Sequence, residues 1–403
     1  MPTVCLLGTL DTKGHEYEYL RARIREQGVD VVLVDAGVFP PQVQPDIDRH
    51  EVAAAAGADA DELAAAGDRG AAVEAMARGA AEIVKRLRAE GRLDGIASVG
   101  GSGNSSIGGI AMRELPVGVP KLIVSTVASG DTRPYMGASD VTMTYSVVDI
   151  AGINQISSQI LTNAAGAIAG MVTAHAPDLA GSKPLVTASM FGVTTPCVTR
   201  ARERLEERGY EVLVFHQTGT GGESMEELMR AGFITGSLDV TTTELADELV
   251  GGVLPAYPRR LEAAGELGLP QVVSLGALDM VNFGPKESVP ERFQDRNLYV
   301  HNPTITLMRT TPDECRELGR RIGRKLSGAT GPTALFIPLR GVSMIAVEGQ
   351  PFHDAEADAA LLEGLRETLG DGVEVHELDM DVNDERFALA MADRLDEMIR
   401  ERR

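Results

Sequence analysis

Short apolar runs alternate along the chain with longer segments whose apolar residues recur at helical spacing. A short apolar run bounded by turn residues predicts a buried strand, and a longer periodic segment predicts an amphipathic helix. In the first half, the predicted strands are residues 4–8, 31–35, 95–99, 121–124 and 141–145. The predicted helices between them are residues 16–27, 71–90 and 107–115. This repeated order predicts a parallel sheet with helices on both faces.

Two segments interrupt this alternation. Residues 37–70 contain a proline cluster followed by alanine-rich, acidic turns, and we interpret them as a surface insertion. Residues 153–173 predict a buried connecting helix, and the stretch APDLAGSKP that follows has the Pro, Gly and Ser of a linker. The predicted fold class is therefore α/β, with two Rossmann-like domains, residues 1–180 and 181–403, each a mainly parallel sheet flanked by helices.

The alternation restarts after the linker. The predicted strands are residues 185–189, 212–215, 272–275, 335–338 and 373–378. The predicted helices are residues 196–208, 223–229, 311–326, 356–369 and 385–400. One helix has a clear start, because Thr311 can cap it, Pro312 occupies the first helical position and Glu314 completes a capping box.

Composition narrows the classes of partner. The chain of 403 residues carries a formal net charge of −21, which argues against a nucleic-acid backbone or an anionic membrane as partner. Its three cysteines are far apart, which disfavours a disulfide framework or a structural zinc site. We see no signal peptide and no apolar stretch of about 18 residues, so we expect a cytoplasmic protein without a membrane span.

The stretch VGGSGNSSIGG at residues 99–109 follows a predicted strand and enters a predicted helix. Free backbone N–H groups at such a helix start favour an anion, and Gly101 and Gly103 would let a phosphate approach closely. Ser102 and Asn104 add side-chain donors. The string is neither a strict GxGxxG nor a GxxxxGK[ST] motif. A tight strand–helix turn that needs left-handed backbone remains the alternative.

The loop after the first strand offers Gly8, Thr9, Asp11 and Lys13, of which the lysine can neutralise a phosphate. Its alternative is an ordinary turn in which Asp11 or Thr12 caps the helix. Carboxyl ends of parallel strands share one edge of a sheet, so we expect this loop to lie beside the glycine-rich loop.

Two further loops reach the same predicted edge. Asp35 ends the second strand, where dinucleotide-binding folds keep an acid for ribose hydroxyls. The loop after the fourth strand contains Asp131, Arg133 and Tyr135, which suit Mg²⁺, a phosphate and a base respectively. The convergence of four polar loops, and no single loop, predicts a nucleotide site.

The second half has a constellation of its own. Cys197 lies in the first turn of a predicted helix, where the helix N-terminus would lower the pKa of its thiol and make it a candidate nucleophile. His216, Asp279 and His301 follow other predicted strands or turns and are candidate base or orienting groups. The alternative is a small buried cysteine and turn histidines.

Several strings together resemble the Tm-one-like ATP-binding domain family, a poorly characterised family that includes the amino-terminal part of a plant tomato mosaic virus resistance protein. The strings are LGTLDTKG, GGSGN, VSTVASGD, TYSVVDIAGIN, MFGVTTP, GALDMVNFG and HNPTITLMRTT. The resemblance implies two Rossmann-like subdomains, ATP binding in the first and a homodimer. The site positions that it implies are Gly8, Thr9, Asp11, Gly100, Gly101, Ser102, Gly103, Asn104, Ser129, Gly130 and Asp131.

The family's second loop often runs GGSGGT, whereas Asn104 and Ser105 stand here. Two hypotheses remain open at this point. In one, the chain is a nucleotide-binding module with ATP, and possible Mg²⁺ at Asp131, that responds to a further small molecule or protein. In the other, it is a hydrolase- or transferase-type enzyme in which Cys197, His216 and His301 face the nucleotide across an interdomain cleft.

Overall fold

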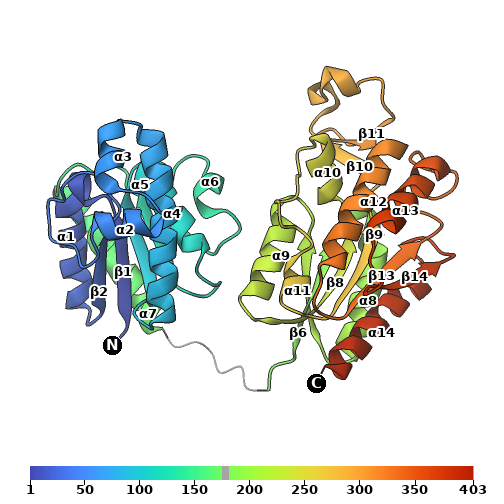
Figure 1. Cartoon of the computed structure of the whole chain (residues 1–403), viewed down its shortest axis with the longest axis horizontal. Coiled ribbons are helices and arrows are strands. Elements are labelled where there is room, and N and C mark those ends of the chain that lie inside the picture. Colours follow the sequence, from blue (N-terminus) through green and yellow to red (C-terminus); the bar gives the residue numbers. More distant parts are fainter. Residues whose placement is uncertain (175–180, 403) are drawn as a thin grey trace. The chain divides into compact units, whose positions relative to one another are not determined.

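The computed structural model describes residues 1–174 and 181–402. The chain folds as two compact units, Met1–Asp178 and Leu179–Arg403 (Figure 1). The predicted domain boundary at residue 180 and most of the predicted linker lie outside the described residues. Among the residues described, no helix combines the length and apolar character needed to cross a membrane.

The first unit is a five-stranded sheet in the order β2-β1-β3-β4-β5, and every neighbouring pair is parallel. Its strands are β1 (Thr3–Gly8), β2 (Asp30–Asp35), β3 (Gly95–Gly100), β4 (Lys121–Ser125) and β5 (Thr142–Tyr145). Its helices are α1 (Leu10–Glu26), α2 (Arg49–Ala55), α3 (Ala60–Ala66), α4 (Arg69–Ala89), α5 (Ser102–Arg113), α6 (Arg133–Met136) and α7 (Gln155–Thr173). The predicted α/β class is confirmed.

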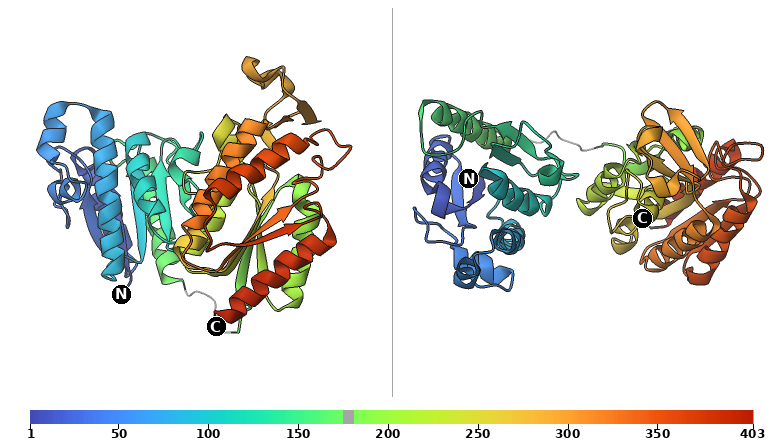
Figure 2. Two further views of the ribbon diagram at one scale, coloured as in Figure 1. Left: turned by 45° about the vertical axis from the view of Figure 1, so that its right-hand side comes forward. Right: turned by 90° about the horizontal axis from the view of Figure 1, so that it is seen from above.

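Alternating residues of the interior strand β1 face two different cores. Val4 and Leu6 pack with the buried residues of α1 and α7 on one face of the sheet. Cys5 and Leu7 pack with those of α4 and α5 on the other. A strand buried on both faces is what a parallel sheet with two helical layers requires, and Figure 2 shows the layers edge-on.

The helices that follow the loops after β1 and β3 both begin at an earlier residue than the apolar pattern predicts. Helix α5 begins at Ser102, within the glycine-rich string, and α1 begins at Leu10. The predicted insertion contains two short helices, α2 and α3, each capped by an aspartate that accepts backbone N–H groups, Asp48 for α2 and Asp59 for α3. The segment is therefore folded, and α2 packs on α4.

The second unit is a six-stranded parallel sheet in the order β14-β13-β9-β8-β6-β7. Its strands are β6 (Leu185–Met190), β7 (Glu211–His216), β8 (Ile234–Thr241), β9 (Gln271–Gly276), β13 (Thr333–Pro338) and β14 (Glu374–Leu378). Its helices are α8 (Thr195–Glu207), α9 (Thr220–Arg230), α10 (Glu244–Val250), α11 (Ala263–Glu266), α12 (Pro312–Ser327), α13 (Ala355–Thr368) and α14 (Glu385–Glu401). It also carries a small antiparallel sheet of β10 (Met280–Phe283), β12 (Ile305–Arg309) and β11 (Leu298–Asn302).

The sequence pattern misses the antiparallel sheet and the interior strand β8. The apolar pattern does not predict strand β8, because Ser237, Asp239 and Thr241 are polar yet buried. Each finds a hydroxyl partner on β6 or its following turn, as in the 2.6 Å bond that Ser189 Oγ donates to Asp239. The capping box at α12 is confirmed, since the Glu314 N–H donates to Thr311 Oγ1 at 3.2 Å and the Thr311 N–H to the Glu314 carboxylate at 2.7 Å.

Candidate functional site

The first unit has a topological switch point between β1 and β3, because the chain leaves β1 toward β2 and then crosses to β3 on the opposite side. Open α/β sheets bind ligands outside the carboxyl ends of the strands at such a point. Asn104 joins the two loops there, since its Oδ1 accepts from the Thr9 N–H at 2.9 Å and its Nδ2 donates to Thr9 Oγ1 at 3.0 Å. The residue that departs from the family string therefore holds the two loops together.

A pocket of about 640 Å³ opens at this switch point. Small-molecule pockets typically measure about 300–1,000 Å³. The lining comes from the loops after β1, β3 and β4 and from the segment that joins β2 to α4. The predicted site residues that line the pocket are Thr9, Asp11, Gly101, Ser102, Gly103 and Asn104.

One wall of the pocket is the start of α5, whose N-cap Gly101 has no side chain to bond the first turn. The N–H groups of Ser102, Gly103 and Asn104 have no acceptor among the described residues, as expected for the first turn of an uncapped helix. Such N–H groups, together with the helix dipole, form a site for an anion.

Gly101 and Gly103 leave this wall open. A Cβ added to Gly101 would meet only Thr126 Oγ1 at 3.5 Å, and one added to Gly103 only Arg69 Nη2 at 3.7 Å. Neither glycine has a positive φ, so the turn itself does not need them. The absent side chains therefore expose backbone to the pocket.

Two cations reach the pocket. Lys13, in the first turn of α1, donates from Nζ to the carbonyl oxygen of Ile150. Arg69 is the first residue of α4, and its guanidinium has no carboxylate within ion-pair distance in the described part of the chain. An unpaired guanidinium that faces uncapped N–H groups concentrates positive potential on one side of the pocket.

The pocket also has an apolar wall. It consists of side chains from the loop after β2, from α3 to α5 and from the turn after β4, namely Val38, Phe39, Leu63, Val73, Met76, Ile107 and Val127. Phe39 is 55% exposed, which leaves an aromatic ring free at the pocket. A flat ring system is the kind of group that such a wall accommodates.

The two predicted aspartates differ in their placement. Asp11 lines the pocket, and its Oδ2 accepts from the Phe39 N–H at 3.2 Å while its Oδ1 has no partner. Asp35 is fully buried and does not line the pocket; its Oδ1 accepts from the N–H groups of Leu10 and Gly37. Burial raises the pKa of Asp35 above its usual value. Asp35 thus fastens α1 and the following loop to β2.

Two of the predicted site glycines have packing roles. A Cβ on Gly8 would lie 1.9 Å from the hydroxyl oxygen of Tyr17, so this glycine lets α1 pack on β1. Gly100 has a φ of 157°, and a Cβ there would lie 2.5 Å from Asn104 Nδ2. Gly100 therefore makes room for the side chain that joins the two loops, and neither glycine lines the pocket.

The loop after β4 reaches the pocket through Thr126 and Val127 rather than through Ser129, Gly130 and Asp131. Asp131 is exposed and accepts a bidentate pair of hydrogen bonds from Arg133, at 2.9 and 2.8 Å. This guanidinium holds the pKa of Asp131 at about 2. The structure does not bring Asp131 to the pocket, and its predicted role toward Mg²⁺ stays a prediction.

In the second unit, the expectation of an activated Cys197 thiol is wrong. The side chain is fully buried in the core between α8 and α14, and this burial raises the pKa of the thiol to about 12. Cys197 does lie in the first turn of α8, as predicted, but its N–H donates to Asn383 Oδ1 at 3.3 Å. The cost of burying a charge outweighs the helix dipole here.

We expect no cysteine to react quickly with Ellman's reagent in the native protein, because Cys5, Cys197 and Cys315 are all buried free thiols. Thiolate character and access decide such reactivity. The measurement is thiol release at neutral pH, with the same assay in guanidinium chloride as the control, where all three should react. Rapid release of one equivalent that is absent in Cys197→Ala would contradict this expectation.

Each of the remaining candidate residues of the second unit contacts a different partner. His216 packs against Phe191 with ring centroids 5.2 Å apart, and His301 against Tyr299 at 6.5 Å. Asp279 is fully buried and accepts from Ser343 Oγ at 2.8 Å. Within the described residues, no hydrogen bond links these candidates to each other or to Cys197. The structure therefore does not assemble a nucleophile–base–orienter set.

The glycine-rich turn after β7 already holds a carboxylate of the same chain. Glu244 Oε1 accepts from the N–H groups of Gly219 and Gly222 at 2.7 and 3.3 Å, at the start of α9. Its other oxygen accepts from Arg260 Nε at 3.1 Å. This turn has the anion-binding geometry that its glycines predict, and an internal side chain fills it.

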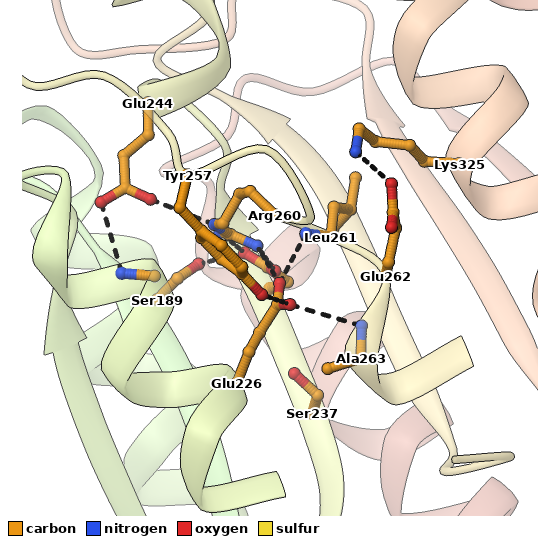
Figure 3. A network of polar contacts seen from close by, with 12 residues as sticks. Ser189, Glu226, Ser237, Glu244, Tyr257, Arg260, Leu261, Glu262, Ala263 and Lys325 are labelled. Atoms are coloured by element: carbon orange, nitrogen blue, oxygen red, sulfur yellow. Dashed lines mark hydrogen bonds and ion pairs between the residues drawn. The ribbon is translucent and has the colours of Figure 1, made fainter. Parts of the chain in front are cut away.

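Arg260 is the centre of a buried polar network (Figure 3). Its guanidinium forms a bidentate ion pair with Asp239, at 2.6 and 2.8 Å, and further pairs with Glu244 and Glu226. Glu226 also accepts from the hydroxyl group of Tyr257. Because three buried carboxylates pair with this one buried cation, the network fixes the chain between α10 and α11, and we interpret its role as structural.

The pocket residues that the sequence pattern misses include Phe39, Leu63 and Arg69, which come from the segment interpreted as a surface insertion. One signal was available for Arg69. Asp68 caps α4 by accepting from the Ala71 N–H at 3.0 Å, and an aspartate before a helical pattern marks such a start. The orientation of the segment toward the pocket has no sequence signal.

The fold and the pocket define a class: an α/β protein of two Rossmann-like units, with a pocket at the switch point of the first. More particularly, the chain belongs to the uncharacterised protein family UPF0261. The N-terminal domain of that family matches residues 2–177 and its C-terminal domain matches residues 183–399.

Relatives from bacteria and a plant agree with this assignment. A UPF0261 protein of Clostridium tetani is 56% identical over 398 residues, which is 98% of each chain. The ToMV resistance protein Tm-1 of Solanum lycopersicum is 40% identical over 415 residues, covering 97% of this chain and 55% of the tomato protein. The resemblance to the Tm-one-like family is thereby confirmed. The solved structure of Acinetobacter baumannii MurG is 14% identical, covers 99% of this chain and 94% of MurG, and has a TM-score of 0.22.

Proposed function

We propose that the first unit binds ATP, or a closely similar nucleotide, in the pocket between the β1 and β3 loops. One observation carries the proposal. The uncapped start of α5, opened by Gly101 and Gly103, lies beside the unpaired Arg69 in a pocket that also has an apolar wall, which includes Phe39. A ligand with an anionic end and a flat ring matches both walls.

In this proposal the phosphates lie against the N–H groups of Ser102, Gly103 and Asn104, and the base lies against the apolar wall. The carboxylate of Asp11, which lines the pocket, accepts a hydrogen bond from a ribose hydroxyl or a base amino group. These local donors are needed because the whole chain carries a net charge of −21 and repels an anion at long range.

The further expectations of the sequence analysis enter as parts of the same proposal. Mg²⁺ would arrive with the triphosphate, and the first carboxylate to test beside it is Asp11 rather than Asp131, because Asp11 lines the pocket and Asp131 does not. The family resemblance supports a homodimer, which sedimentation velocity tests. A cytoplasmic location and a further small-molecule or protein partner also remain proposals.

We expect the full chain to bind a non-hydrolysable ATP analogue with micromolar affinity in calorimetric titration, with and without Mg²⁺. Amide hydrogen exchange then locates the ligand: exchange should slow in peptides from residues 97–113 and 36–76 and stay unchanged in the second unit. Absence of binding at millimolar analogue, or protection confined to the second unit, would overturn the proposal.

A further inference from the structure

Arg69 is a cation at an electrostatically unfavourable position, without a carboxylate partner in the described part of the chain. It is exposed at the first residue of α4, where the helix dipole disfavours a cation. Two other arginines of the same helix have carboxylate partners, Arg78 with Glu74 at 2.6 Å and Arg86 with Glu51, while Arg88 donates to the Leu93 carbonyl oxygen. Arg69 has no carboxylate partner in the described part of the chain, although acidic residues outnumber basic ones, 59 to 38.

The guanidinium of Arg69 lies over the start of α5, and none of the carboxylates that line the pocket forms an ion pair with it. Its Nη2 lies 3.7 Å from the Cβ position of Gly103, over the first turn of α5. The carboxylates that line the pocket all bond elsewhere: Asp11 to the Phe39 N–H, Asp68 to the Ala71 N–H and Asp149 to the Ile150 N–H. The α5 dipole and the guanidinium therefore favour the same external negative charge.

We infer that Arg69 is the specificity-determining residue of the pocket, whose guanidinium binds the phosphate oxygens held at the start of α5 and so selects a phosphorylated ligand over the bare nucleoside. The inference rests on the proposed function and adds to it the group that reads charge. Because the same segment supplies Phe39 and Leu63, one stretch of chain contributes to the recognition of both ends of the ligand.

Three probes separate the two ends of the ligand: ATP, adenosine and inorganic tripolyphosphate, each titrated calorimetrically into the full chain in EDTA at fixed ionic strength. Arg69→Gln should weaken ATP and tripolyphosphate binding by about 10- to 100-fold, the loss of one or two charge-assisted hydrogen bonds, and leave adenosine unchanged. Arg69→Lys should lose less. Arg78→Gln, on the same helix but outside the pocket, is the matched control and should bind all three probes as the wild type does.

The outcomes distinguish this inference from the proposed function. Unchanged ATP affinity in Arg69→Gln, or an equal loss for adenosine, would overturn the role of Arg69 while leaving the nucleotide proposal intact. Arg69-dependent binding of tripolyphosphate without binding of ATP or adenosine would support Arg69 as the reader of charge and refute the nucleotide proposal. A wild-type protein that binds none of the probes would overturn both.

Discussion

Gly101→Val and Gly103→Val are each expected to abolish measurable nucleotide binding while the first unit stays folded. A Cβ at either position has no protein atom closer than 3.5 Å, so the valine methyl groups extend into the space in front of the α5 N–H groups. The backbone tolerates the change, because Gly101 has a φ of −91° and Gly103 lies inside the helix. Replacing a glycine N-cap by valine costs roughly 1 kcal/mol or less, which a folded domain survives.

The matched control is Gly166→Val, on the exposed face of α7, where an added Cβ meets no atom within 4 Å. It places the same side chain in the same unit, away from the pocket, and should bind the ATP analogue as the wild type does. Calorimetric affinity, with far-UV circular dichroism to establish folding, is the measurement. Wild-type affinity in both pocket variants would remove the start of α5 from the site.

The position of the pocket follows from sequence because parallel strands bring their carboxyl ends to one edge of a sheet. The loops that contain Thr9 and Gly101 are therefore predicted to be neighbours, and Asn104 bonds to Thr9 across a separation of 95 residues. The same reasoning does not hold for the later residues of the loop after β4. A loop's first residues follow the strand, so Thr126 reaches the pocket, whereas Asp131 turns away and pairs with Arg133.

Arg69 and Phe39 could not be placed in this way, since neither follows a strand directly at the predicted edge. Phe39 depends on the path of a proline-rich loop, which the Phe39 N–H bond to Asp11 fixes in part. Arg69 depends on where α3 ends and α4 begins, and Gly67 in a left-handed conformation makes that turn. Both contacts are set by tertiary packing of a segment whose local pattern describes only short helices.

The sequence around Cys197 contains a signal that predicts a buried side chain, whereas the expectation of a reactive thiol rests on its position in the first helical turn. Val198, Ala201 and Leu205 recur at helical spacing with the cysteine, and all four side chains are buried. The apolar face of α8 therefore includes Cys197, and its thiol faces the core. Position in the first turn lowers a thiol pKa only where the sulfur stays near solvent or donors, so desolvation decides the outcome.

The sequence pattern misses strand β8 because some of its buried residues are polar. One of these polar residues belongs to the network for which we expect the largest effect on stability. Asp239 on β8, Glu226 on α9 and Glu244 on α10 are all buried, and each accepts from the Arg260 guanidinium. The attraction of these carboxylates raises the pKa of Arg260 well above its usual value against the effect of burial, so the residue stays charged. A buried anion that loses its cation is left uncompensated.

Arg260→Met should accordingly destabilise the second unit by about 3–5 kcal/mol, the range for breaking a buried ion pair by removing one partner. Arg259→Met is the neighbouring control: its ion pair with Glu266 is exposed, and such pairs contribute about 0–1 kcal/mol. Amide hydrogen exchange of the full chain in increasing urea reads each unit separately, and β8 peptides should lose protection in Arg260→Met alone. Equal effects of the two substitutions would show that the carboxylates find water or protons at little cost. Unchanged protection of the first unit's peptides in Arg260→Met would show that its pocket does not depend on this network for stability.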